Sequence, residues 1–381
     1  MISLSSVIDA YIDINILLLL ALVLWMTSRT LLRSFGMKYA YSTQLHLLNG
    51  VFLATLLLPL IVALGGKALL PAGAESINLS DFVLAQYLNG SFEMRPLAVE
   101  SLLDIRHRFS IEIATLSTPF AATLVGLLCV GVAVSVLRLG MGILWLRNIV
   151  DSSFIWRQFG NLQLRLSDTV TVPFSTRTLK RRIVVIPSSF LENTAELNIV
   201  LGHEFQHLRQ HDLEWEIALE LLKPLFFWNP AFCIWKRKME TLRELSCDQN
   251  VVMRKKLNVV AYCYCLLKVC KNSLVHPKLF AVTVPRVALV ETRTSLFGLD
   301  SANELHDRLI SLLEFETKQC PKVVYLLIFV PLIAITLFAT IAIQQPKDWS
   351  QDSLMLSSIV NLERLAEHNG SVPEIVPRQA N

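Results

Sequence analysis

Long apolar runs separated by polar segments dominate the pattern of this chain. Four of them reach the roughly 20 residues that a bilayer-spanning helix needs. They are about Tyr11–Leu32, Leu45–Leu64, Thr115–Leu137 and Val323–Ile343. The first is not a cleavable signal peptide, because its basic residues, Arg29 and Arg33, follow the apolar core instead of preceding it. We therefore expect an α-helical membrane protein with four transmembrane helices.

The composition agrees with this prediction. Hydrophobic residues make up 53% of the 381 positions and charged residues 17%, whereas soluble domains carry about 25% charge. This balance argues against a soluble cytosolic enzyme and excludes a disordered chain. The net charge of +4 is mild. We expect the lipid bilayer as a partner and no direct nucleic-acid binding.

Basic residues beside the spans set the expected orientation, because Lys and Arg gather on the cytoplasmic side. They are Arg29, Arg33 and Lys38 after the first span, Arg138 and Arg147 after the third, and Lys318 and Lys322 before the fourth. Both termini are then extracytoplasmic. All seven cysteines lie in the third span or in the segment expected to be cytoplasmic, where disulfides are rare.

The spans divide the chain into six parts. These are two transmembrane helices with a short cytoplasmic loop (1–65), an extracytoplasmic loop (66–112), the third helix (113–138), a cytoplasmic domain (139–322), the fourth helix (323–343) and a short extracytoplasmic tail (344–381). The domain begins with strand signals, namely the alternating Leu162, Leu164 and Leu166 and the β-branched run Ile183–Ile186. From Asn193, which forms a capping-box pattern with Glu196, the pattern becomes helical. The domain is therefore expected to be α+β.

The first helix of this domain carries a metal-binding motif. His203, Glu204 and His207 form HExxH, and four residues are just over one helical turn. Both imidazoles therefore project from one face and can bind one metal ion, while Glu204 can accept a proton from a water as general base.

A second helix can complete this site. Asn229 and Pro230 are typical of a helix cap and first turn, and Glu244 and Asp248 follow four residues apart. Catalytic zinc takes three protein ligands and one open position. Glu244 can supply the third ligand, and Asp248 can accept a hydrogen bond from a liganding imidazole. The two motifs together predict a Zn²⁺ site.

Other residues give weaker evidence for a functional site. His211 is not expected to be a metal ligand, because the glycine and the third histidine of the metzincin pattern are absent after His207. We expect it to be a polar residue at a helix end. Cys263, Cys265 and Cys270 match no zinc spacing, and buried structural thiols are expected there. A cluster of aromatic residues lies near the expected start of the second helix, namely Phe226, Phe227, Trp228, Phe232 and Trp235. These side chains could anchor the domain to the bilayer, line a substrate groove or pack in the core, and the sequence leaves all three possibilities open.

The runs Leu201–Asp212, Asn229–Pro230 and Arg243–Asp248 resemble the membrane-bound zinc peptidases of the BlaR/MecR antirepressor family. The similarity extends to the four-span layout and the strand segment 172–187. It implies a cytoplasmic gluzincin-type metalloprotease domain, inserted between the third and fourth spans of a protein of the bacterial inner membrane. It further implies zinc on His203, His207 and Glu244, with Glu204 as general base.

This chain departs from the family in two places. Residues 344–381 are too short for the extracellular penicillin-binding sensor domain of the β-lactam receptors and contain no SxxK motif. The strand segment reads Ser175-Thr176-Arg177-Thr178 where the family usually has a glycine. We therefore do not expect antibiotic sensing by acylation, and we expect an altered substrate-binding edge.

The expected function is that of a zinc metalloendopeptidase in signal transduction. It would cleave a cytosolic or membrane-proximal protein, with a transcriptional repressor as the substrate that the resemblance implies. An extended substrate is expected to pair with the sheet edge near Val170–Phe174. Tyr262, Tyr264 and His276 are candidate oxyanion donors, and the loop 284–303 is a candidate self-cleavage segment.

Two alternatives belong to other classes. A non-proteolytic membrane receptor or scaffold with a structural zinc site is disfavoured by Glu204, because a structural site does not need a general base. A transporter is disfavoured because carriers place ionisable groups near the bilayer midplane, whereas Asp13 and His46 lie at span edges.

Overall fold

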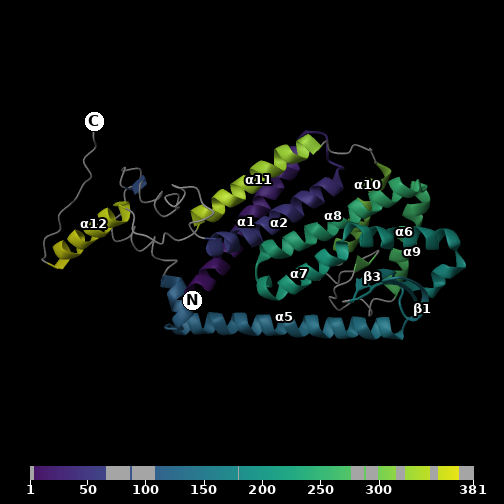
Figure 1. Cartoon of the computed structure of the whole chain (residues 1–381), viewed down its shortest axis with the longest axis horizontal. Helices are drawn as coiled ribbons and strands as arrows, with labels where there is room; N and C mark the ends of the chain where they lie inside the picture. The colour runs from purple at the N-terminus through teal and green to yellow at the C-terminus, as the bar shows by residue number, and fades with distance from the viewer. Residues whose placement is uncertain are drawn as a thin grey trace. The chain divides into compact units, whose positions relative to one another are not determined.

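Four helices among the described residues are long and apolar enough to cross a membrane, as the sequence predicts. They are α1 (Leu4–Ser34), α2 (Tyr41–Gly65), α5 (Pro119–Ser152) and α11 (Lys322–Ile343) (Figure 1). The computed structural model describes residues 4–65, 86–87, 108–178, 180–275, 287–288, 299–314, 322–343 and 351–368.

Helix α5 differs from the prediction at both ends. It begins at Pro119 and not at Thr115, because Leu116 has a left-handed backbone (φ 50°) that breaks the preceding helical turn. The Thr118 hydroxyl then accepts a hydrogen bond from the Ala121 amide at 3.2 Å and caps the new helix. At the other end, α5 continues past residue 138 to Ser152 and adds apolar side chains, such as Leu146, to the core of the following domain.

The chain forms two compact units. The first contains Met1–Trp25, Gly50–Leu127 and Leu326–Asn381, and the second contains Met26–Asn49 and Leu128–Tyr325. In the first unit, Gly50 of α2 lies against the ring of Phe329 in α11, so that a Cβ at Gly50 would come within 2.5 Å of that ring. The same unit contains α12 (Gln351–His368).

The second unit contains a five-stranded mixed sheet. Its strands are β1 (Phe154–Phe159), β2 (Leu162–Ser167), β3 (Phe174–Arg177), β4 (Arg182–Pro187) and β5 (Val287–Ala288), in the order β1-β2-β4-β3-β5. Strands β2 and β4 are parallel, and the other pairs are antiparallel. The alternating leucines lie in β2 and the β-branched run lies in β4, so both strand predictions are confirmed.

The predicted substrate edge near Val170–Phe174 is wrong as an edge. Strand β3 lies between β4 and β5, with Phe174 opposite Ala288 and Ser175 opposite Val287. The outer strand on this side is therefore β5. The sequence gives no sign of this pairing, because a two-residue strand has no periodicity of its own.

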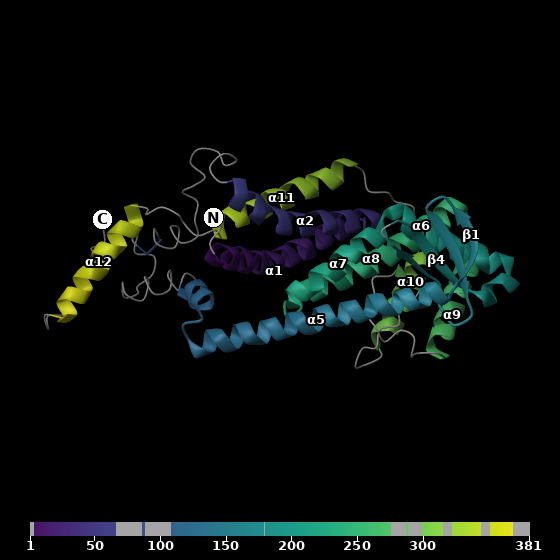
Figure 2. The ribbon, with the colours of Figure 1, turned by 60° about the horizontal axis from the view of Figure 1, so that its bottom comes forward.

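Helices cover the sheet and supply most of the unit. They are η3 (Ser188–Glu192), α6 (Thr194–Gln210), α7 (Asp212–Phe226), α8 (Pro230–Lys255), α9 (Val259–Val275) and α10 (Leu299–Leu313). Figure 2 shows α6, α9 and α10 gathered with the strands at one end of the unit. The core between them joins Val184 of β4, Val200 of α6 and Val269 of α9, which are completely buried.

The two predicted helix starts are confirmed. Asn193 caps α6 by accepting hydrogen bonds from the Ala195 and Glu196 amides. Glu196 does not complete the capping box, and instead contacts Lys268 Nζ at 2.8 Å. Asn229 caps α8 in the same way, with Pro230 in its first turn.

The short connection between α1 and α2 docks on the second unit, to which it belongs. The Gln249 side chain on α8 donates a hydrogen bond to the Tyr39 carbonyl at 3.1 Å. The Tyr39 hydroxyl in turn donates to the Glu314 carboxylate just beyond α10. This connection therefore lies against the helices that carry part of the candidate site.

Candidate metal centre

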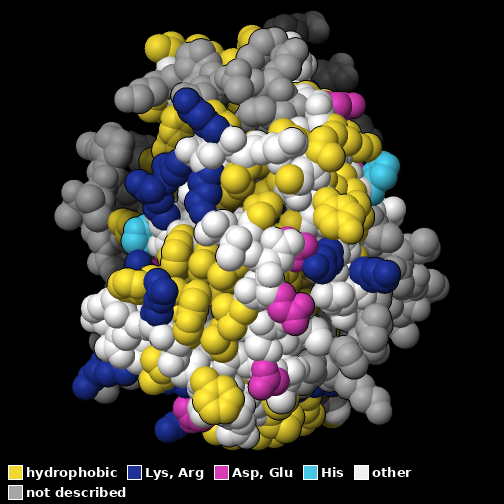
Figure 3. Space-filling view, turned by 90° about the vertical axis from the view of Figure 1, so that its right-hand side faces the viewer, with side chains coloured by type: hydrophobic (Ala, Val, Ile, Leu, Met, Phe, Trp, Pro, Cys, Tyr) yellow, Lys and Arg dark blue, Asp and Glu magenta, His cyan; other side chains and the backbone are white. Residues whose placement is uncertain are grey.

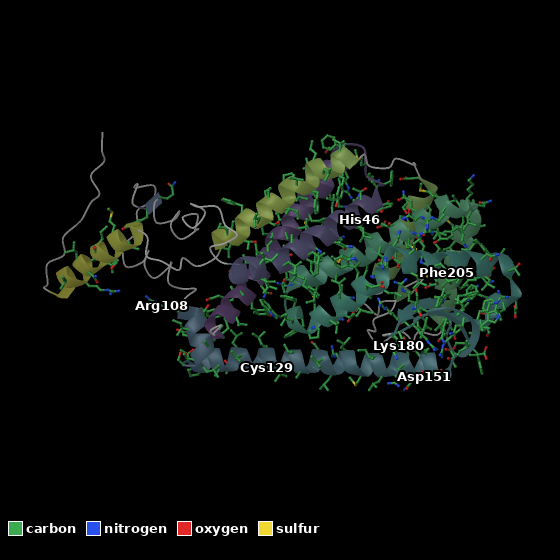
Figure 4. The ribbon with its side chains drawn as sticks, viewed as in Figure 1. His46, Arg108, Cys129, Asp151, Lys180 and Phe205 are labelled. Atoms are coloured by element: carbon green, nitrogen blue, oxygen red, sulfur yellow. The ribbon has the colours of Figure 1, made fainter. Side chains whose placement is uncertain are left out.

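Helix α6 places the HExxH side chains in the interior of the second unit. His203, Glu204 and His207 are completely buried, which is rare for polar side chains unless they are paired or bind a ligand. The two imidazoles point their Nε2 atoms at each other, 2.9 Å apart. By contrast, Phe205 on the same helix, labelled in Figure 4, is partly exposed (37%).

Glu244 of α8 brings its carboxylate to the same point. One oxygen lies 3.5 Å from His203 Nε2 and the other lies 3.5 Å from His207 Nε2. A tetrahedral zinc ion with bonds of about 2.0–2.1 Å would hold its ligand atoms about 3.3 Å apart. The three side chains therefore fit a single metal ion of that kind.

The outer nitrogen of each imidazole has a partner that fixes its tautomer. His207 Nδ1 lies 2.8 Å from the Asp212 carboxylate at the start of α7. His203 Nδ1 lies 2.8 Å from the Tyr262 hydroxyl, which donates to Asp248 Oδ1 at 2.7 Å. With the proton on Nδ1 in both rings, each Nε2 keeps a lone pair for a metal.

Cys247 offers a second donor set. His203, His207 and Cys247 are all buried, and their candidate ligand atoms lie within 4.8 Å of one another. The Cys247 thiol, however, approaches His203 on the Nδ1 side, at 3.6 Å. That side is occupied by the Tyr262 hydroxyl, whereas the two Nε2 atoms converge on Glu244. The geometry of the convergent atoms favours Glu244 over Cys247.

Arg308 of α10 holds both acidic residues of α8. Its guanidinium makes a bidentate pair with Asp248, at 2.7 and 2.8 Å, and a third nitrogen lies 3.3 Å from Glu244 Oε2. Burial by itself would raise the pKa of Asp248, but the charges and hydrogen bonds of Arg308 and His203 together lower that pKa. Asp248 is therefore an anion that accepts hydrogen bonds on the outer side of His203.

Glu204 has one bound oxygen and one open oxygen. The Ser175 hydroxyl of β3 donates to Oε2 at 2.6 Å. Among the described residues, no hydrogen-bond partner faces Oε1, although that atom is buried. Burial raises the pKa of this carboxyl, with the nearby histidines acting in the opposite sense. Ser175, in the strand segment that departs from the family pattern, therefore contacts the expected general base.

The remaining sequence candidates lie elsewhere. Tyr262 is wrong as an oxyanion donor, because its hydroxyl is engaged behind His203, on the side opposite Nε2. Tyr264 is 67% exposed on α9, and His276 lies outside the described residues. His211 is an exposed left-handed residue that ends α6, as expected for a helix end.

A chain of buried ion pairs leads from the candidate site along α7 and α8. Arg243 donates to the Asp212 carbonyl at 3.3 Å and to the Glu216 carboxylate at 2.7 Å. Lys236 contacts Glu216 at 3.1 Å and Glu220 at 2.8 Å, and it also pairs with Glu240. The chain therefore joins the residue that orients His207 to the distal part of the helical hairpin.

Three residues of this arrangement were not found from the sequence in their present roles. The sequence patterns give Asp212 and Arg308 no role at the metal centre, and they predict Tyr262 there only as a candidate oxyanion donor. Arg308 lies sixty residues beyond Asp248, and a lone arginine in an amphipathic helix has no spacing that relates it to the motif. Only packing of α10 on α8 brings it there.

Comparison with known proteins finds relatives for the part of the chain that contains this site. Residues 155–293 match the sequence model of the BlaR1 peptidase M56 family. The chain is also similar to the methicillin resistance mecR1 proteins of Staphylococcus aureus and Staphylococcus epidermidis, at 25% identity over 122 residues. That similarity covers 28% of this chain and 21% of each relative, so the match spans about a fifth of their length. Together these matches show that the chain is similar to BlaR/MecR-type proteins, with residues 155–293 resembling the M56 peptidase family.

Proposed function

We propose that this protein is an integral-membrane, zinc-dependent endopeptidase of the gluzincin type. The observation that carries the proposal is the convergence of His203 Nε2, His207 Nε2 and the Glu244 carboxylate beside the buried Glu204. Its membrane character rests on the four long apolar helices and on the relatives.

His203, His207 and Glu244 would hold the metal, and Glu204 would move the proton. When bound, zinc supplies Lewis-acid chemistry that polarises a peptide carbonyl and lowers the pKa of a water from about 15.7 towards 7. Glu204 Oε1 is the open atom that accepts a proton from the attacking water and passes it to the leaving amine. Ser175 holds the other carboxylate oxygen and so fixes the direction in which Oε1 points.

The proposed substrate is a cytosolic or membrane-proximal protein, with a transcriptional repressor as the first candidate by family resemblance. The connection carrying Arg33 and Lys38 is expected to be cytoplasmic by the positive-inside rule. Tyr39 of that connection contacts the domain that holds the candidate site. A cytoplasmic connection therefore implies a cytoplasmic site, with both termini of the chain on the other side of the inner membrane.

Metal content tests the ligand set. The full chain purified in detergent should hold about one zinc ion per molecule. The Glu244→Gln variant should lose most of it, whereas the Cys247→Ser variant should keep it. The opposite result, loss in Cys247→Ser and retention in Glu244→Gln, would replace Glu244 by the His-His-Cys donor set.

Cleavage tests the reaction. We expect the zinc-loaded wild type to cleave unfolded β-casein, and the Glu204→Gln variant to bind zinc without cleaving it. Equal cleavage by both proteins would exclude Glu204 as the base. Stoichiometric zinc with no cleavage by the wild type would favour the receptor or scaffold with a structural zinc site.

A further inference from the structure

The tip of the α7–α8 hairpin has no charged residue. From Pro224 to Trp235, twelve successive residues are uncharged, and most are aromatic or aliphatic. Several large apolar side chains at or near this tip are exposed, with Trp228 at 47%, Leu225 at 47% and Ile234 at 40%. Exposed apolar residues that cluster in this way mark an interaction surface.

This tip lies against the third span. Gly131 of α5 is so close to Phe227 that a Cβ there would come within 2.1 Å of the ring. Figures 1 and 2 both show the hairpin running alongside α5. In Figure 4 its free end lies near the level of Cys129, far from Asp151 at the end of the same helix.

The distance along the helix axis to the first charged residue is about the same on α5 and on α8, which places the tip at the depth of Gly131. Gly131 precedes Arg138, the first charged residue after the span, by seven residues, which is about 10 Å of helix axis. Along α8, the charge-free stretch from Pro230 ends six residues later at Lys236, which is about 9 Å. Helical elements that lie in a membrane interface bury their apolar face about 5–10 Å deep.

The backbone N–H and C=O groups of the tip form internal hydrogen bonds, as an apolar surrounding requires. Polar groups of the main chain must be satisfied internally where no water is present. The Asn229 side chain accepts from the Ala231 and Phe232 amides at 2.8 and 3.4 Å. The Asn229 amide itself donates to the Phe226 carbonyl at 3.0 Å, and its carbonyl accepts from Cys233. The turn between the two helices is therefore closed by its own hydrogen bonds.

Basic residues flank the charge-free stretch on both helices. Lys223 precedes it on α7, and Arg237 and Lys238 follow on α8. Such residues suit the anionic headgroups of a cytoplasmic leaflet. Figure 3 shows a different surface at the end of the unit that carries β1 and α9, where charged side chains of both signs are interspersed with apolar ones.

From these observations we propose that the α7–α8 tip is a re-entrant membrane element that enters the acyl-chain region of the bilayer beside α5. The occupant of its exposed apolar face is lipid. The domain with the candidate metal centre would then be fixed to the membrane surface at two places, α5 and the hairpin. This inference does not depend on the metal or on proteolysis.

Spin labelling at native Cys233 tests the proposal, since this cysteine is exposed within the charge-free stretch. The full chain is placed in vesicles of phosphatidylethanolamine and phosphatidylglycerol, with Cys129, Cys270 and Cys320 replaced by serine and the buried thiols left in place. A second protein keeps Cys129 and carries Cys233→Ser, Cys270→Ser and Cys320→Ser; its label at 129, 2 residues from Gly131 in the span, gives the lipid reference. A third protein has all four of these cysteines replaced by serine and carries Phe159→Cys, an exposed site (56%) on β1, which gives the aqueous reference.

We expect the label at 233 to collide with oxygen, which concentrates in lipid, and to be shielded from a water-soluble nickel chelate. The ratio of the two collision rates should be close to that at 129 and several-fold above that at 159. A ratio like that at 159 would overturn the proposal. So would an immobile label that neither quencher reaches, because protein and not lipid would then cover the tip. Retained zinc in the labelled proteins, or a melting temperature equal to that of the unlabelled wild type where zinc is absent, shows that folding has survived.

Discussion

Arg308 pairs with Asp248 through two hydrogen bonds of 2.7 and 2.8 Å, sixty residues apart in the chain and completely within the interior. The same guanidinium reaches Glu244 at 3.3 Å. One arginine on α10 thus positions both the carboxylate that would bind zinc and the carboxylate behind His203. The α1–α2 connection contacts the residue just beyond the same helix, at Glu314.

This pairing predicts that Arg308→Lys weakens zinc binding. Lysine keeps the charge but cannot make the bidentate contact, and loss of an outer partner of metal ligands typically costs about 10–100-fold in metal affinity. Competition with a chromogenic zinc chelator measures the change. Arg254→Lys, an exposed arginine on α8, is the matched control and should bind zinc as the wild type does. Unchanged affinity in Arg308→Lys would remove Arg308 from the site.

Ser175 should affect turnover more than metal binding. Ser175→Ala removes the hydrogen bond to Glu204 Oε2, which is worth about 1 kcal/mol, or roughly fivefold in rate. We therefore expect a several-fold lower kcat with zinc affinity unchanged. Ser188→Ala, at a half-buried serine that pairs with Asp168, serves as the control. Loss of zinc in Ser175→Ala would show that this residue supports the fold of the site and not the base.

Glu216 should make the protein sensitive to acid. Burial by itself would raise its pKa, but Lys236 and Arg243 lower it to about 2 from an ordinary value of 4.5. A pKa that is lower in the folded state stabilises the fold above the ordinary value, and this contribution disappears as the pH falls from 4.5 towards 2.

The melting temperature of the detergent-purified protein should therefore fall across that window. Glu216→Gln should melt lower at neutral pH, because it removes the carboxylate that pairs with the buried Arg243, and its melting temperature should depend less on pH. Glu192→Gln at an exposed position is the control. Identical pH profiles for wild type and Glu216→Gln would contradict the assignment.

Gly131 should be required for the contact between α5 and the hairpin. Gly131→Leu places a side chain where the Phe227 ring lies, so we expect a lower melting temperature. Gly140→Leu on the same helix is the matched control, because a Cβ at Gly140 would have no neighbouring atom within 4 Å. Adding Phe227→Ala to Gly131→Leu should restore part of the loss, whereas additive effects of the two changes would show that they do not touch.

The sequence by itself determined the features that depend on local pattern. Apolar length set the four candidate spans, and alternation set β2 and β4. Cap chemistry at Asn193 and Asn229 set the starts of α6 and α8. Helical spacing was enough to place His203 and His207 on one face, because four residues make just over one turn.

Tertiary structure decided everything that required two distant segments to meet. The approach of α8 to α6 brings Glu244 within 3.5 Å of both histidines. Packing of α10 on α8 places Arg308 beside Asp248 and Glu244. The position of α9 places the Tyr262 hydroxyl at His203 Nδ1, and not where an oxyanion donor is expected. Pairing of β5 removed the edge predicted at β3. Contacts of this kind depend on non-local burial and charge pairing, which leave no period in the sequence, and so only the folded chain could assign them.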